Sequence, residues 1–105
     1  MSGQERIKQQ IENHSIVLFM KGNAEMPLCG FSARAVNILK SCGAPFATID
    51  VLQDDEIRQG IKVYSNWPTI PQLYIKGEFI GGSDIIAEMY EAGELQTLIQ
   101  DVAIS

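Results

Sequence analysis

Shortages of metal-binding residues, long apolar runs and positive charge exclude several classes of protein. The chain has two cysteines and one histidine in 105 residues, so it lacks the repeated Cys/His spacing of a zinc site. No stretch approaches the ~20 apolar residues of a membrane-spanning helix, and the N-terminus lacks the basic-then-apolar layout of a signal peptide. The net charge of −5 argues against nucleic acid or an anionic membrane as the main partner.

The composition that remains is that of a globular domain. Hydrophobic residues make up 46% and charged residues 20% of the chain, which is ordinary for a folded protein in water. A chain of this length buries roughly 60–65% of its unfolded surface without disulfides or metal staples. We find no internal repeat, low-complexity tract or linker, so we predict a single domain over residues 1–105.

The two cysteines lie too far apart to pair. Cys29 and Cys42 are separated along a predicted helix by thirteen positions, which at 1.5 Å per residue is about 20 Å. A disulfide needs Cα atoms within about 7 Å of each other. We therefore expect two independent thiols, which indicates a reducing, cytoplasmic compartment.

Hydrophobic periodicity and turn residues predict the element order α-βαβ-α-ββ-αα. Strands are expected at residues 16–20, 46–51, 72–75 and 78–80, and helices at 2–13, 30–42, after Asp54 or Asp55, after residues 81–83, and at 95–102. The first two strands flank one helix and should be parallel, whereas Lys76 and Gly77 are typical of a hairpin. The result is a four-stranded mixed sheet with helices on both faces, the α/β thioredoxin-like fold.

One stripe of each early helix is apolar at helical spacing and is expected to face the sheet. The inward residues predicted for the first three helices are Ile7 and Ile11; Phe31, Ala35, Ile38, Leu39 and Cys42; and Ile57, Ile61 and Tyr64. Cys42 continues the stripe of its helix, so we expect it to pack in the core. Gly43 follows as a residue suited to end that helix.

Cys29 is the strongest candidate for chemistry, because it falls on the turn from the first strand into the second helix. Free N–H groups and the helix dipole favour an anion there, and such a thiol can have its pKa lowered from ~8.5 into roughly the 3.5–7.5 range. The alternative is a small buried core residue, but Cys29 lies off the apolar stripe. A C-x-x-C redox motif would need a cysteine at position 32, where this chain has Ser32.

A second signal is the run Trp-Pro-Thr-Ile-Pro-Gln at residues 67–72. Pro71 could simply introduce a strand. In a thioredoxin-like fold, however, a cis Ile70–Pro71 bond would face the cysteine and leave the main chain of Ile70 free to pair with a peptide.

A third signal is Gly-Gly-Ser-Asp at residues 81–84, which has two possible roles. Ser83 or Asp84 could cap the helix that follows. Alternatively, the segment could form a carboxylate-binding nest in which Asp84 accepts a hydrogen bond from a ligand amine.

These motifs together resemble the monothiol glutaredoxins, in particular the short single-domain bacterial type. The matching motifs, in order, are Met-Lys-Gly at 20–22, Pro-Leu-Cys-Gly-Phe-Ser at 27–32, Trp-Pro-Thr-Ile-Pro-Gln at 67–72 and Gly-Gly-Ser-Asp at 81–84. The resemblance implies that Cys29 is the active thiol and metal ligand, and that glutathione binds Lys21, Arg58, the main chain of Ile70, Ser83 and Asp84. Many relatives carry cysteine where this chain has Ser83, so the nearest possible resolving thiol is missing.

Two functions are consistent with this site. A [2Fe–2S] cluster usually takes four thiolates, which Cys29 and one glutathione would supply if a two-fold homodimer doubled both. The resemblance implies storage and delivery of such clusters to apo iron–sulfur proteins, with a BolA-like protein as an alternative partner. The other function is glutathione-dependent thiol–disulfide exchange by a monothiol route. A thiolate held as a metal ligand should be slow at exchange, so we expect at most weak oxidoreductase activity.

Overall fold

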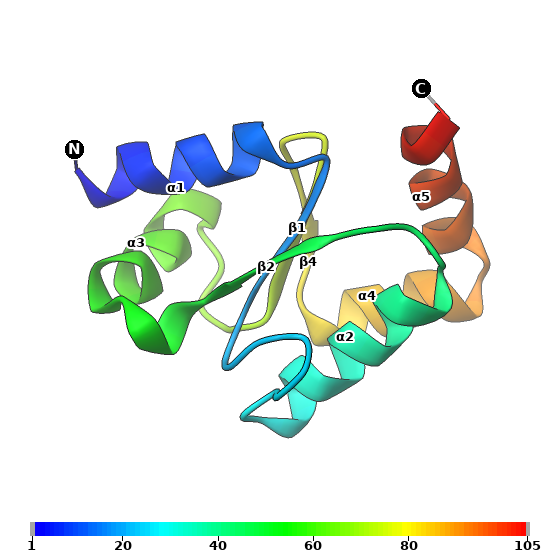
Figure 1. The fold of residues 1–105 in the computed structure, drawn as a ribbon, viewed down its shortest axis with the longest axis horizontal. Helices are drawn as coiled ribbons and strands as arrows, with labels where there is room; N and C mark the ends of the chain where they lie inside the picture. Colours follow the sequence, from blue (N-terminus) through cyan, green and yellow to red (C-terminus); the bar gives the residue numbers. More distant parts are fainter. Residues whose placement is uncertain (1, 105) are drawn as a thin grey trace.

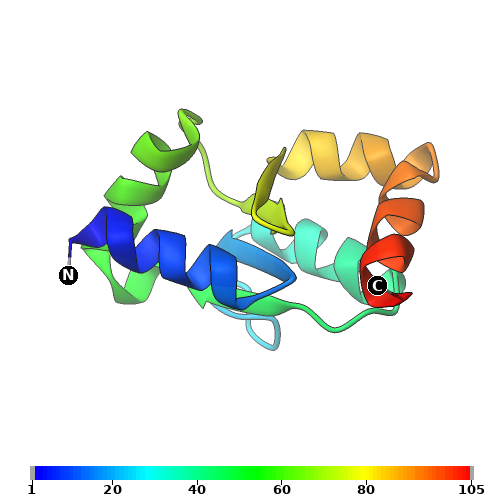
Figure 2. The ribbon, with the colours of Figure 1, turned by 90° about the horizontal axis from the view of Figure 1, so that it is seen from above.

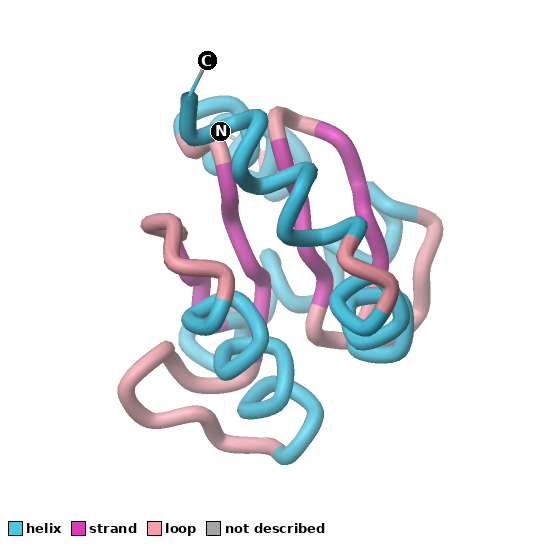
Figure 3. Tube along the Cα trace, turned by 90° about the vertical axis from the view of Figure 1, so that its right-hand side faces the viewer, coloured by secondary structure: helices cyan, strands magenta, loops and turns pink. Residues whose placement is uncertain are grey.

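A four-stranded mixed sheet organises the chain, in the strand order β2-β1-β3-β4. Figure 3 shows its strands in magenta among the surrounding helices. In the computed structural model, which describes residues 2–104, β1 (Ile16–Met20) runs parallel to β2 (Ala47–Asp50). On its other side β1 pairs antiparallel with β3 (Gln72–Ile75), which forms a hairpin with β4 (Glu78–Gly81). The predicted α/β thioredoxin-like topology is therefore confirmed.

Helices cover both faces of this sheet (Figures 1 and 2). The helices are α1 (Gly3–Asn13), α2 (Gly30–Ser41), α3 (Asp55–Ser65), α4 (Ser83–Glu91) and α5 (Glu94–Ile104). Helices α1 and α3 lie on one side of the strands, and α2, α4 and α5 lie on the other. Among the described residues, no helix is long and apolar enough to cross a membrane.

The alternation of side chains along β1 divides the core into two parts. Leu18 and Met20 pack toward α2, α4 and α5, whereas Val17 and Phe19 pack toward α1 and α3. Every residue of β1 is buried, as expected for a central strand covered on both faces. The end of β1 is therefore a rigid starting point for Lys21, the residue that follows it.

The N-terminus of α3 is fixed by a capping carboxylate. The Asp54 side chain accepts from the N–H groups of Glu56 and Ile57, and it also bonds the Arg6 guanidinium of α1. The hydrogen bond from Arg6 is the main reason that the pKa of Asp54 lies below its usual range. The helix was expected after Asp54 or Asp55, and the structure shows that Asp54 is the cap and Asp55 the first helical residue.

The predicted boundaries differ from the structure mostly at the ends of elements. The first helix begins at Gly3, because Ser2 is its N-cap, and the second ends at Ser41, with Cys42 as its C-cap. The second strand covers only residues 47–50, because residues 51–53 form a 3-10 turn, η1 (Val51–Gln53), that was not predicted. Helix α5 begins one residue earlier and ends two residues later than expected.

Two residues predicted to face the core are exposed. Phe31 is 64% exposed and Tyr64 is 38% exposed. Phe31 lies at the edge of the buried face of α2, which is formed by Ser32, Ala35, Val36 and Leu39, and Tyr64 is the second-last residue of α3. Tyr64 still contacts the buried ring of Tyr74 edge-on, with ring centroids 6.1 Å apart. Cys42 is partly buried against the core, and this burial raises the pKa of its thiol.

Candidate functional site

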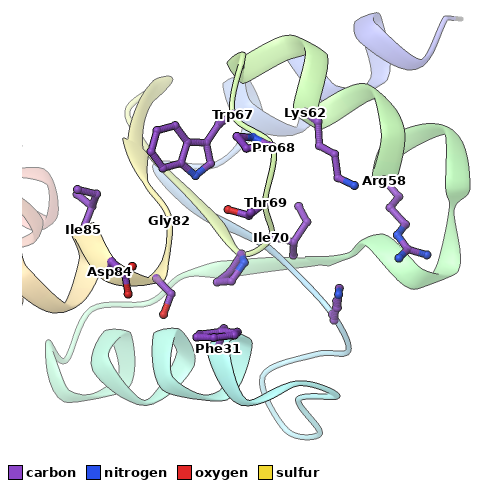
Figure 4. Close-up of a pocket in the computed structure, with 13 residues that line it drawn as sticks. Phe31, Arg58, Lys62, Trp67, Pro68, Thr69, Ile70, Gly82, Asp84 and Ile85 are labelled. Atoms are coloured by element: carbon purple, nitrogen blue, oxygen red, sulfur yellow. The ribbon is translucent and has the colours of Figure 1, made fainter.

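A pocket of about 410 Å³ opens between the start of α2, the length of α3, the loop before β3 and the start of α4 (Figure 4). It is lined by Lys21, Phe31, Arg58, Lys62, Trp67, Pro68, Thr69, Ile70, Pro71, Gly82, Ser83, Asp84 and Ile85. The elements that meet here come from four separate parts of the sequence. Five residues predicted from the sequence to bind one ligand therefore share one pocket: Lys21, Arg58, Ile70, Ser83 and Asp84.

Cys29 lies next to this pocket as the N-cap of α2. Its extended backbone, with φ −151° and ψ 154°, places the sulfur over the first turn of the helix. There Sγ accepts the main-chain N–H of Ser32 at 3.3 Å. A thiol thus occupies the position where serine or aspartate usually caps a helix, which is the placement the sequence predicted.

Ser32 is the closest polar partner of the thiol, and it is fully buried. Its Oγ lies 3.4 Å from Cys29 Sγ and accepts the main-chain N–H of Lys21 at 3.1 Å. Because the Lys21 N–H occupies an acceptor site of this oxygen, the hydroxyl hydrogen can point at the sulfur. In the sequence Ser32 stands out only as the residue in place of a second cysteine, so this contact was not predicted.

The surroundings of Cys29 favour the thiolate. Partial burial alone would raise its pKa, but this is outweighed by the hydroxyl and N–H of Ser32, the N–H of Phe31 and the positive charge of Lys21. The pKa of Cys29 is consequently lowered from its ordinary value. The lowering was predicted from the position of Cys29 at a helix N-terminus, and the structure adds Ser32 as its largest favourable cause.

One end of the pocket is cationic. Arg58 and Lys62 are four residues apart on α3, and both side chains point toward the pocket (Figure 4). Together with Lys21 they bring three positive groups to the pocket lining. Within residues 2–104 none of the three forms an ion pair with the protein. Lys62 was missed by the sequence reasoning, although its spacing from Arg58 would have placed both on one helix face.

The opposite end of the pocket is formed by the N-terminus of α4. Of the two alternatives for this motif, capping by Ser83 or Asp84 is not found: Gly82 is the N-cap, and no side chain caps the helix. Ser83 Oγ is buried without a hydrogen-bond partner, and Asp84 is exposed in the first turn. Free N–H groups, a free hydroxyl and a carboxylate therefore meet at one place.

Gly82 allows the two walls of the pocket to approach each other. A Cβ at this position would lie 3.1 Å from Trp67 Nε1 and 3.4 Å from the carbonyl oxygen of Pro71. A side chain here would have to displace the indole or narrow the pocket. This close approach explains, in addition to turn formation, why the residue at position 82 is a glycine.

The loop over residues 66–71 forms the remaining wall. The Ile70–Pro71 bond is cis, as the sequence predicted. Trp67, Pro68, Thr69 and Ile70 follow one another along the wall, and the indole of Trp67 packs on Phe79 with ring centroids 5.9 Å apart. The sequence identified this loop but singled out only Ile70 as a binding residue.

A protein-only metal site is not found in the described part of the chain. Within residues 2–104, no group of three or more His, Cys, Asp and Glu side chains lies close enough to hold a metal ion. Cys29 and Cys42 are both free thiols. Any metal bound at Cys29 would need further ligands from outside this chain.

Comparison with known proteins identifies relatives over most of the chain. A family model described as Glutaredoxin matches residues 16–80. A monothiol glutaredoxin (ycf64-like) of Synechocystis is 58% identical over 95 residues, which are 90% of this chain and 89% of the relative. Glutaredoxin 4 of Haemophilus influenzae is 54% identical over 99 residues, 94% of this chain and 92% of the relative. The solution structure of reduced poplar apo GrxS14 is 48% identical with a TM-score of 0.83, covering 97% of this chain and 94% of that one.

Proposed function

Because this chain belongs to the glutaredoxin family, among its monothiol members, we propose that it binds glutathione in the pocket and carries a [2Fe–2S] cluster as cargo. The observation that carries the proposal is a single thiol beside a pocket whose two ends differ in charge. The lowered pKa of this thiol favours its thiolate form. Neither feature alone would suffice. Together they match a small thiol ligand that carries charges at both ends.

The charges of the pocket fit those of glutathione. The tripeptide has a simple carboxylate at its glycine end, and this end would lie among the cations Lys21, Arg58 and Lys62. Its γ-glutamyl end carries both a carboxylate and an ammonium. The free N–H groups of α4 and the unpartnered Ser83 Oγ would bind that carboxylate, and Asp84 would bind the ammonium.

The middle of the ligand would pair with the loop. Ile70 lines the pocket between Arg58 and Asp84 (Figure 4), so its main chain would exchange peptide hydrogen bonds with the cysteinyl residue of glutathione. A ligand held at both ends and at Ile70 would have its thiol directed toward the side of the pocket where Cys29 lies. The four contacts orient the ligand, and the chemistry is left to the sulfur atoms.

A cluster shared by two chains would complete its thiolate ligands. Each chain contributes Cys29 and one bound glutathione, and two chains give the four thiolates that a [2Fe–2S] cluster usually takes. Gly30, next to Cys29, has nothing within 4 Å of its Cβ position, so this surface is open to close approach. We further propose a cytoplasmic location, apo iron–sulfur proteins as acceptors, and a BolA-like protein as an alternative partner to the second copy.

The lowered pKa of Cys29 favours thiol–disulfide exchange as the second candidate function. The Cys29 thiolate would attack the glutathione sulfur of a glutathionylated protein, and the protein thiolate would leave and take a proton from water. A second glutathione thiolate would then attack the Cys29–glutathione disulfide, giving glutathione disulfide and regenerating Cys29. Glutathione is the reductant, and no second protein cysteine takes part.

Anaerobic reconstitution with iron and sulfide, with and without glutathione, tests the carrier proposal. We expect visible cluster absorption and dimeric mass in gel filtration only when glutathione is present, and a return toward monomer after chelation. A cluster that assembles equally well without glutathione would contradict the ligand set. Equal elution volumes for the apo and loaded protein would contradict the bridge between two chains.

A further inference from the structure

We propose that Gln72, which does not line the pocket, is a positioning residue that fixes the pocket wall over residues 67–69. The proposal rests on the glutathione site argued above, because it concerns how that site is held open. Gln72 is the first residue of β3 and is fully buried. Burying an amide costs free energy unless the amide is hydrogen-bonded. The hydrogen-bond partners of Gln72 therefore indicate which part of the structure it stabilises.

Both donors of the Gln72 amide are used by the loop. Nε2 donates to the carbonyl oxygens of Trp67 and Thr69, each at 3.1 Å. A side-chain amide has two N–H groups, so this donor capacity is saturated by two residues of the pocket wall. The first residue of β3 thereby anchors the loop that precedes the strand.

Apart from the packing of Trp67 on Phe79, the loop has few other interactions that fix its main chain. Pro68 and Pro71 have no N–H to donate. The N–H of Trp67 bonds the end of α3, through the Lys62 carbonyl oxygen and Ser65 Oγ. Asn66 likewise bonds the end of α3, and beyond these anchors the hydrogen bonds found for residues 67–71 within residues 2–104 are the two from Gln72.

The carbonyl of the Gln72 amide is held by Tyr74. Its hydroxyl donates to Gln72 Oε1 at 3.3 Å, which turns the NH₂ group toward the loop. Burial raises the pKa of Tyr74 to about 12, so the hydroxyl keeps its proton and stays a donor at physiological pH. The ring of Tyr74 is itself packed between Phe19 and Phe79.

The position of the loop matters to the ligand because the loop is one side of a narrow gap. The Trp67 indole lies 3.1 Å from the Cβ position of Gly82, the N-cap of α4. Ile70, the proposed main-chain partner of glutathione, follows directly after Thr69. A loop released from Gln72 would shift both the gap at Gly82 and the peptide contact at Ile70.

Gln72→Met tests the inference, since methionine has similar length but no polar atoms. The matched control is Gln96→Met: Gln96 is half-buried in α5, its Nε2 donates to the Tyr90 carbonyl oxygen at 3.0 Å, and it does not line the pocket. We measure glutathione affinity by calorimetry, thermal unfolding, and the emission of Trp67, which is the single tryptophan and so reports on the loop itself.

Gln72→Met should weaken glutathione binding roughly three- to tenfold and shift Trp67 emission, while Gln96→Met should lower thermal stability and leave affinity and emission unchanged. Unchanged affinity and emission in Gln72→Met would overturn the inference, because Gln72 would then contribute to stability alone. Should Gln72→Met not fold, Tyr74→Phe removes the hydroxyl that orients the amide, and the same shift in emission is expected. If the unmodified protein did not bind glutathione, the proposed function would fail, and Trp67 emission alone would decide the role of Gln72.

Discussion

The buried hydroxyl of Ser32 lies 3.4 Å from the sulfur of Cys29, and the N–H of the same residue donates to that sulfur at 3.3 Å. One residue thus makes two hydrogen bonds with the sulfur, through its N–H and its hydroxyl, and its oxygen also accepts the Lys21 N–H. A monothiol site differs from a C-x-x-C site at this position. Serine here acts as a fixed donor to the thiolate, where a second cysteine would form a disulfide with it.

Ser32→Ala should therefore raise the pKa of Cys29 in the apo protein. Below its pKa the thiol is neutral and alkylates slowly, so the midpoint of the alkylation rate against pH should move upward in the variant. The measurement is the rate of iodoacetamide labelling of Cys29 across pH. Ser41→Ala is the control, because Ser41 Oγ bonds Asn37 on the same helix away from the thiol. An unmoved midpoint in Ser32→Ala would show that the hydroxyl does not contribute, and that the helix N–H groups and the charge of Lys21 lower the pKa without it.

Strand positions were predicted from the sequence more closely than helix faces. Strands β1 and β3 occupy the predicted residues, because their short apolar runs are bounded by polar and turn residues. Periodicity gives the angle of a side chain about the helix axis and not its height along the sheet. Tyr64 has the correct angle but is the second-last residue of α3, whereas the buried face of α2 is formed by Ser32, Ala35, Val36 and Leu39 and leaves Phe31 at its edge. Both predictions therefore failed.

The residues of the candidate site that were predicted are those whose placement follows from a short sequence motif. Asp84 and Ser83 follow a glycine turn, and Cys29 follows a strand, so their placement depends on local sequence. Ser32 and Gln72 act through contacts with residues up to eleven positions away, and Lys62 only through its place on the same face as Arg58. Such contacts depend on the packed structure, which is why the sequence reasoning missed them.

Cys29→Ser should abolish cluster assembly while the fold is retained, because Cys29 is the free thiol beside the pocket. Serine is a good helix N-cap, so stability should change little. Cys42→Ser is the matched variant: it should still assemble the cluster, with a packing cost of ~1 kcal/mol from burying a hydroxyl. Visible absorption after reconstitution and thermal unfolding measure the two effects. A Cys29→Ser protein that still bound the cluster would contradict the proposal that this chain carries a cluster through Cys29.

Lys21→Ala and Arg58→Ala should each weaken glutathione binding by roughly 1–3 kcal/mol, the loss expected for a charge-assisted hydrogen bond. If glutathione supplies half of the cluster ligands, the lifetime of the cluster should shorten in the same variants. Calorimetry and the decay of visible absorption measure the two quantities. Lys8→Ala is the control, since Lys8 is exposed on α1 and pairs with Glu12 far from the pocket lining. A cluster lifetime indifferent to both pocket cations would rule out glutathione held in this pocket as a ligand.

Gly30→Ala separates the fold from the contact between two chains. Nothing lies within 4 Å of the Cβ position of Gly30, and its backbone is helical, so the apo variant should be as stable as the unmodified protein or more stable by roughly 0.4–1 kcal/mol. The same methyl group would stand beside Cys29 on the surface where a second chain must approach to share a cluster. We therefore expect lower cluster yield and less dimer in gel filtration, with glutathione affinity unchanged because Gly30 does not line the pocket. Full loading and full dimerisation of a stable Gly30→Ala protein would mean that the chains do not meet at this surface, and the bridging arrangement would have to be abandoned even if Cys29 remained a ligand.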